Sequence, residues 1–335
     1  MLSRIGPWVF LVLAAVVPLA LATDYQLFQL TMVAVYAIAI LGLNLVTGYN
    51  GQISLGHGAF YAVGAYVTAV LMDKFDVPYW ATLPIAAAVC AGVGFLLGLP
   101  ALRLGGLYLA LTTFALAVAT PQLLKYKLIE GWTGGVQGIT ITKPDAPFDL
   151  PLDADQFLYL FSLAVGALIF ALAANLVRGR IGRAMMAVRD HPLAAEAMGI
   201  DIALFKTRTF AVSAMVTGLA GSLGAIAIQF VSPDSFNVQL SIFLFVGMVV
   251  GGTASIAGPI IGALFIEFLP NAAEQVSKAA PGAVYGLVLI ACMFLMPSGA
   301  AGLVRRLRAS RRRPDEARGL PNLTSLQPAK GETKP

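Results

Sequence analysis

Apolar residues in this chain recur in blocks of about 20, and this pattern limits its fold more than any other feature. About 20 helical residues, at 1.5 Å each, cross a hydrocarbon core about 30 Å thick. Charged residues make up only 12% of the 335 residues, against about 25% in soluble proteins. The pattern therefore predicts an all-α polytopic membrane protein with about ten transmembrane helices. The ten blocks lie at roughly 5–22, 27–47, 53–72, 80–99, 104–123, 156–177, 209–230, 238–252, 257–271 and 282–303.

The distribution of basic residues predicts the orientation of these spans. Lys and Arg favour cytoplasmic segments, and ten spans place both termini on one side of the membrane. The segment 178–208 holds six of the 22 Lys and Arg residues and the segment after 303 holds nine, so we expect both termini to be cytoplasmic. The blocks at 238–252 and 257–271 have only 15 residues each, so eight or nine spans with a re-entrant piece remain open.

The two ends of the chain differ from the part between them. Arg4 and the apolar run Trp8–Ala22 also fit a cleavable signal peptide, which is an alternative to a first span. Residues 1–303 form the predicted transmembrane domain. Residues 304–335 are basic and poor in apolar side chains, so we expect a disordered cytoplasmic tail whose arginines lie near lipid head groups.

Few residues are available for catalysis or for metal binding. The chain has two cysteines and two histidines, and none of them shows metal-ligand spacing. It contains no G-x-x-x-x-G-K-[ST] phosphate loop, no G-x-S-x-G nucleophile elbow and no basic stretch interleaved with aromatic residues. We therefore expect no enzyme activity, no cofactor, no metal site and no nucleic-acid partner.

The segment 43–66 combines five glycines with polar side chains in an otherwise apolar region. Glycine permits close helix packing or a break in the backbone, and polar groups at membrane depth are costly unless they face protein or water. We expect an irregular joint that lines a substrate pathway. The alternative is a short polar loop before a glycine-packed helix, in which the lone histidine is only an interior hydrogen-bonding group. The predicted pathway residues of this segment are Asn44, Asn50, Gln52, Ser54 and His57.

A second glycine-interrupted segment lies at 247–263, where Gly251, Gly252 and Ser255 precede the pair Gly258-Pro259. Gly-Pro favours a break because proline lacks a backbone donor. Two interrupted segments in comparable positions of two halves indicate a substrate site near the membrane midplane, to which Gly251, Gly252 and Ser255 would contribute. A re-entrant turn needed only for packing is an equal alternative. The two segments align poorly with each other, so the sequence does not establish an internal duplication.

The polar loop 178–208 is too long and too regular for a simple connector. Pro192 suits the first position of a helix, and Gly199 suits a helix end. We expect a short surface helix over Leu193–Met198, with another turn or two over Ala184–Arg189. It either lies on anionic lipid head groups or docks onto a soluble cytoplasmic partner, because acidic residues interrupt its basic ones.

Three runs carry a family resemblance: GYNGQISLGHGAFYAVGAY, GRAMMAVRDHPLAAEAMGID and GGTASIAGPIIGA, in this order. They resemble the permeases of branched-chain amino acid ABC importers, the LivM type most closely, over roughly residues 27–303. The resemblance implies a subunit of the bacterial inner membrane that pairs with a LivH-like permease. It also implies two cytoplasmic ATPase subunits and an extracytoplasmic solute-binding protein. By this resemblance the loop 178–208 couples to the ATPase through Gly182, Arg183, Arg189, Asp190, Glu196, Ala197 and Gly199.

The function implied by this resemblance is ATP-driven import of branched-chain or related hydrophobic amino acids by alternating access. The same machinery serving urea or short-chain amides is an alternative. The loop 124–155, expected outside, is the predicted contact for the binding protein, unless it is only an ordered cap over the pore. A more distant alternative is an ion-coupled secondary transporter, which needs an intramembrane carboxylate such as Glu267.

Overall fold

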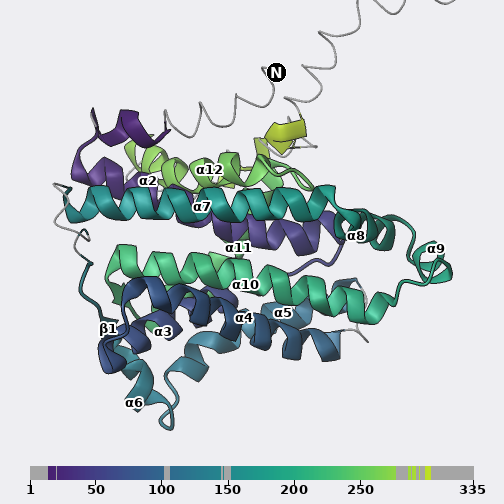
Figure 1. Cartoon of the computed structure of the whole chain (residues 1–335), viewed down its shortest axis with the longest axis horizontal. Coiled ribbons are helices and arrows are strands. Elements are labelled where there is room, and N and C mark those ends of the chain that lie inside the picture. Colours follow the sequence, from purple (N-terminus) through teal and green to yellow (C-terminus); the bar gives the residue numbers. More distant parts are fainter. Residues whose placement is uncertain are drawn as a thin grey trace, which may run out of the picture.

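A computed structural model describes residues 14–19, 21–101, 106–144, 146, 152–276, 286–287, 289–291, 294 and 299–302. Most of the predicted first span, most of the block 282–303 and the tail 304–335 lie outside these residues. Long helices dominate the fold (Figure 1), so the predicted all-α polytopic class is confirmed. The elements are α2 (Asp24–Asn44), η1 (Leu45–Tyr49), α3 (His57–Phe75), α4 (Tyr79–Ala101), α5 (Leu107–Leu124), α6 (Glu130–Thr133), η2 (Gly135–Gln137), β1 (Ile139–Thr140), α7 (Ala154–Arg178), α8 (Arg180–Asp190), α9 (Pro192–Ala197), α10 (Ile202–Ile228), β2 (Phe230–Val231), η4 (Pro233–Phe236), α11 (Val238–Gly251) and α12 (Gly258–Val276).

Every predicted block from 27–47 to 257–271 forms a helix. Five helical stretches of the described chain are long and apolar enough to cross a membrane, namely α2 with η1, α4, α5, α7 and α10. α11 is apolar but has only 14 residues, as its short block predicts. The helices α3 and α12 have 19 residues each and contain the polar or glycine-rich stretches noted in the sequence.

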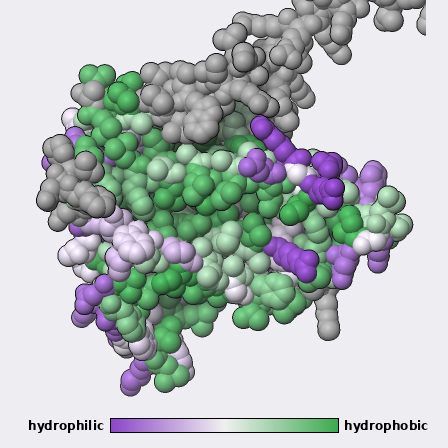
Figure 2. Space-filling model, viewed as in Figure 1, coloured by the Kyte–Doolittle hydropathy of each residue, from purple (hydrophilic) through white to green (hydrophobic). Residues whose placement is uncertain are grey.

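The central helix of the bundle is α10, which packs against α2, α3 and α4. Most residues of α2 and α10 are buried, whereas most residues of α4, α5 and α7 are exposed or only partly buried. Glycine lets α3 and α10 pack closely against each other: a Cβ placed on Gly64 of α3 would lie only 2.0 Å from Gly218 O of α10. Apolar surface covers the middle of the described helices and hydrophilic residues gather toward the ends (Figure 2), as expected of helices in a bilayer.

At one end of the bundle, loops form an ordered cap around a two-stranded antiparallel sheet. β1 pairs with β2, with Ile139 opposite Val231, and Lys125 Nζ lies 2.5 Å from Asp234 Oδ1. The Trp132 ring stacks on Phe75, with centroids 6.1 Å apart. This cap contains most of the described part of loop 124–155, and it lies at the opposite end from α8 and α9 (Figure 1).

Candidate functional site

The predicted joint after α2 begins with a π-helical segment. η1 (Leu45–Tyr49) continues α2, and the chain then leaves helical geometry until α3 begins at His57. Gly51 has φ +73°, a left-handed conformation that glycine adopts at little cost. The Thr47 hydroxyl donates to Gln52 O at 2.9 Å and closes this turn. π-helical segments are rare and frequently occur at functional sites.

His57 connects the joint to α10 through its two ring nitrogens. Nδ1 lies 2.9 Å from Ser54 Oγ, and Nε2 lies 2.7 Å from Ser213 Oγ. The Ser213 hydroxyl donates to Gly42 O at 2.6 Å, so its oxygen accepts from Nε2–H. Ser54 Oγ–H then donates to Nδ1, which carries no proton. The ring is therefore a satisfied interior hydrogen-bonding group in this conformation.

Two amide side chains of the joint have different surroundings. Gln52 Nε2 donates to Lys206 O near the start of α10, at 3.2 Å. Asn50 is 1% exposed, and neither atom of its amide has a hydrogen-bond partner within the described chain. An unpaired buried polar group costs about 1–3 kcal/mol. Contacts among the described residues therefore account for the Gln52 amide but leave the Asn50 amide unexplained.

Asn44 joins the first interrupted segment to the second. Its Nδ2 donates to Ser255 O at 2.8 Å, and the backbone N–H of Ala254 donates to its Oδ1 at 2.9 Å. Both ends of one buried amide are thus used to hold two segments that are 210 residues apart. The two interruptions that the sequence predicts are therefore in direct contact.

Backbone turns shape the second interruption. Gly252 and Ala254 have φ of +110° and +53°, and the Ser255 hydroxyl accepts from the backbone N–H of Gly258 at 3.2 Å, where α12 begins. A Cβ on Gly251 would lie 2.1 Å from Gly258 O. In this conformation Gly251, Gly252 and Ser255 serve the turn itself, and their predicted role in a pathway stays a prediction.

The first joint lies toward one end of the bundle. Its partners Lys206 and Ser213 both belong to the first half of α10, which begins five residues after α9 ends. The joint therefore lies beside the half of α10 next to α8 and α9, and its predicted position near the membrane midplane stays a prediction. Ser213 is a site residue that sequence reasoning missed, because a single serine in an apolar helix gives no distinguishing signal.

The predicted surface helix exists as α9, with Pro192 in its first turn. Gly199 follows with φ +85°, so this glycine ends the helix as predicted. The preceding helix, α8, has 11 residues and begins at Arg180, so it is longer than the turn or two expected over Ala184–Arg189. Glycine at position 182 permits the sharp turn between α7 and α8, because a Cβ on Gly182 would lie 1.9 Å from Val177 O.

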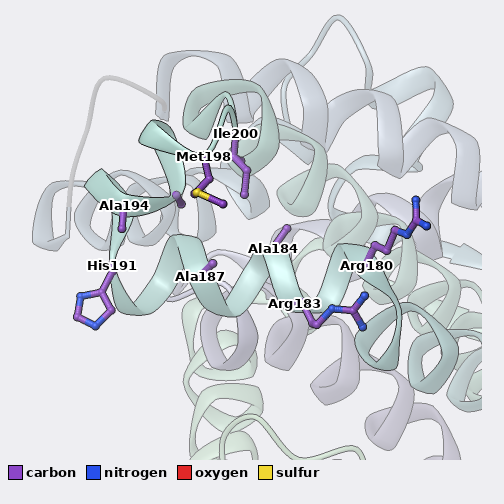
Figure 3. A pocket seen from close by; sticks show the side chains of 9 residues that line it. Arg180, Arg183, Ala184, Ala187, His191, Ala194, Met198 and Ile200 are labelled. Carbon is purple, nitrogen blue, oxygen red and sulfur yellow. The ribbon is translucent and has the colours of Figure 1, made fainter.

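A groove of about 570 Å³ separates α8 from α9 (Figure 3). Alanine side chains of both helices, Met198 and Ile200 make it largely apolar, while Arg180 and Arg183 of α8 add positive charge. Leu193 and Met198 of the α9 region are 82% and 84% exposed, which is unusual for large apolar side chains facing water. We call this groove, together with Leu193 and the exposed residues Glu196, Ala197 and Gly199, the α8–α9 surface.

Arg189 and Asp190 end α8 with an ion pair. Arg189 Nε donates to Asp190 Oδ1 at 2.8 Å. This hydrogen bond, reinforced by the charges of Arg189 and His191, holds the pKa of Asp190 below its usual value. Asp190 therefore remains negatively charged at neutral pH, and Arg189 is available to act as a fixed cation.

Metal and carboxylate chemistry find little support in the part of the chain that the structure describes. No group of three or more His, Cys, Asp or Glu side chains within it could hold a metal ion. Glu267 is partly buried on α12, and none of the ion pairs found among the described residues includes it. A single carboxylate is a weak basis for ion coupling.

Comparison with known proteins identifies the family. Residues 25–297 match the family described as branched-chain amino acid transport system / permease component. The chain belongs to this family. The chain is 35% identical over 261 residues to the high-affinity branched-chain amino acid transport system permease protein LivM of Salmonella typhimurium, covering 70% of this chain and 60% of the relative. It is 34% identical over 286 residues to LivM of Escherichia coli, covering 76% and 66%.

More distant relatives are also named as permeases. A probable LivH of Methanocaldococcus jannaschii is 26% identical over 279 residues, covering 78% of this chain and 87% of the relative. No solved structure matches the chain significantly. The resemblance of the three sequence runs to LivM-type permeases is thus confirmed, and the apolar helices agree with a multi-pass membrane component of a transport system.

Proposed function

We propose that this chain is the membrane-spanning permease subunit of an ATP-driven importer for branched-chain or related hydrophobic amino acids. In this proposal it pairs with a LivH-like permease in the bacterial inner membrane, with both termini in the cytoplasm. Two ATPase subunits bind below and a solute-binding protein binds above. Separate ATPase subunits supply the free energy, because the chain has no phosphate-binding loop of its own.

The α8–α9 surface carries this proposal. It lies between two long apolar helices, α7 and α10, and presents exposed apolar side chains beside an arginine-lined groove. Lipid head groups would favour a uniformly basic face, but Glu196 and Asp201 interrupt the basic charge. A mixed apolar and charged surface of this kind suits a protein partner, so we assign it to the ATPase.

The opposite end supports the remaining part of the proposal. The cap around β1 and β2 exposes Leu128, Trp132 and Val136 by 80%, 52% and 68%, and we assign it to the solute-binding protein. The substrate would pass beside the contact between the two interruptions, with Asn50 as a polar group of this joint that lacks a partner within the described chain. Alternating access would then open this region toward each side in turn.

Reconstitution tests the proposal directly. The chain is co-expressed with its neighbouring transport genes, purified as a complex and placed in proteoliposomes with ATP at the ATPase face. We expect uptake of radiolabelled L-leucine that needs ATP, the ATPase subunits and the binding protein, and that excess urea or acetamide does not inhibit. Inhibition by urea or acetamide would reassign the substrate. Uptake by the chain alone, abolished by ionophores, would instead support an ion-coupled transporter.

A single substitution tests the α8–α9 surface. Leu193→Asp should weaken copurification of the ATPase about tenfold, the effect of losing about 1.4 kcal/mol of binding free energy. Leu193→Met is the matched control, because it keeps an apolar side chain at the same exposed position. Because this side chain is exposed, neither change should alter thermal stability of the permease. Equal ATPase recovery with both variants would contradict the assignment of this surface.

A further inference from the structure

Arg189, at the end of α8, reaches into the bundle. Its Nη1 donates to Gly48 O in η1 at 2.7 Å, while Nε pairs with Asp190 at the surface. The aliphatic part of Arg189 packs on Gly51, where a Cβ would lie 2.6 Å from Arg189 Cγ. α8 is therefore fixed to the first joint by a charge-assisted hydrogen bond and by a close contact that requires glycine.

Gly48 is also in contact with the second interruption. A Cβ on Gly48 would lie 2.1 Å from Asn44 Oδ1 and 2.7 Å from the backbone nitrogen of Ala254. Asn44 itself binds Ala254 and Ser255. An unbroken series of contacts thus runs from α8 through Arg189 and Gly48 to Asn44 and the turn between α11 and α12.

We propose that Arg189 is the positioning residue that transmits movement of α8 to both helix interruptions. The inference rests on the proposed function, because α8 moves in this way only when an ATPase acts on the α8–α9 surface. It assigns Arg189 a role inside the permease, distinct from the ATPase contact that the family resemblance implies for this residue. The relay thereby reaches the region that contains Asn50 without Arg189 touching the substrate.

In this proposal the π-helical segment η1 is the element that changes between two arrangements, which coupling between distant sites requires. In a π-helical turn each N–H donates to the carbonyl five residues earlier, whereas in an α-helix it donates to the carbonyl four residues earlier. η1 can therefore become α-helical when its N–H groups exchange one carbonyl partner for the next. Arg189 holds the carbonyl of Gly48, which lies within η1. Displacing that carbonyl favours one arrangement over the other. It also moves Asn44, which lies one helical turn before Gly48.

The test measures leucine imported per ATP hydrolysed by the intact complex in proteoliposomes. Arg189→Ala should still assemble and hydrolyse ATP, but its ratio of leucine to ATP should fall at least tenfold. Arg189→Lys, which keeps the charge and one donor for Gly48 O, should recover part of the ratio. Arg208→Ala is the matched control, because Arg208 is an exposed arginine of α10 and its loss should leave the ratio unchanged.

A second variant perturbs the same contact from the other side. Gly51→Ala adds a Cβ at φ +73° that would lie 2.6 Å from Arg189 Cγ, so it should also lower the ratio. Gly92→Ala on α4, where a Cβ meets nothing within 4 Å, should not lower the ratio.

A normal ratio of leucine to ATP in Arg189→Ala overturns the inference. Loss of assembly in both Arg189→Lys and Gly51→Ala also overturns it, since Arg189 would then be a structural anchor. If the wild-type complex fails to import leucine with ATP, the proposed function fails first and this inference fails with it.

Discussion

The two interrupted segments of this chain differ in how their turns are held. Side chains hold the first: Gln52 and His57 bind α10, and Arg189 of α8 binds Gly48. Close backbone packing holds the second, where a Cβ on Gly262 of α12 would lie 2.1 Å from Gly247 O of α11. The side chain of Asn44 bridges the two segments.

This difference predicts different motions for the two segments. Hydrogen bonds from side chains can be exchanged one at a time, so the first segment can change shape without unpacking helices. Backbone contacts between glycines leave no space for rearrangement, so α11 and α12 should move as one unit about their turn. The first segment is therefore the one that can change shape, and the second keeps α11 and α12 together as one rigid unit.

The largest effect should come from adding a methyl group to the second segment. Gly262→Ala forces a Cβ against the backbone of Gly247, and overpacking of this kind costs about 1–3 kcal/mol or more. We expect the free energy of unfolding in detergent to fall by about 3 kcal/mol, measured by chemical denaturation. Gly92→Ala, in open space on α4, should leave it within about 0.5 kcal/mol. Equal stability of the two variants would remove the distinction between the segments.

A smaller effect should follow from cutting the bridge between the segments. Asn44→Ala leaves the partly buried N–H of Ala254 without its acceptor, a loss of about 1–3 kcal/mol. Hydrogen exchange at residues 252–257 should accelerate, and the free energy of unfolding should fall by about 2 kcal/mol. Asn175→Ala, at an exposed position of α7, is the control for loss of an asparagine. Unchanged exchange at 252–257 would show that the bridge is dispensable.

The smallest effect on stability should appear at Asn50, where the effect on transport should be large. Asn50→Leu removes a buried amide with no partner in the described chain, so the free energy of unfolding should stay within about 1 kcal/mol or rise. Leucine uptake should nevertheless fall. Gln52→Leu, the matched change at an amide that does have a partner, should lower the free energy of unfolding by about 1 kcal/mol. Normal uptake by Asn50→Leu would exclude Asn50 from the pathway.

Local signals in the sequence predicted much of this structure. Apolar blocks located the helices, and Pro192 with Gly199 located α9, because hydropathy and helix-end preferences act over a few residues. The contact of Asn44 with Ala254 and Ser255 could not be predicted, since nothing near Asn44 indicates partners 210 residues away. The strands β1 and β2 have two residues each, too few to produce an alternating pattern.

Two residues show why the site was harder to predict than the fold. Arg189 precedes Asp190 in a polar loop, so its charge indicated a surface role, yet its guanidinium also reaches a carbonyl inside the bundle. His57 indicated a pathway residue because of its polar surroundings, and this stays a prediction; its Nε2 holds α3 against Ser213 of α10, while its Nδ1 binds Ser54 of the joint. In each case the direction of the side chain, which tertiary packing sets, decides the role.

The small sheet fixes one end of α10, and this affects how the helix can move. α10 ends at Ile228, and β2 begins at Phe230 and pairs with β1. This pairing attaches one end of the helix to the cap. The other end follows α9 and receives any pull on that helix. We expect a pull on α9 to tilt α10 about this pairing, and α2, α3 and α4, which pack against α10, to move with it.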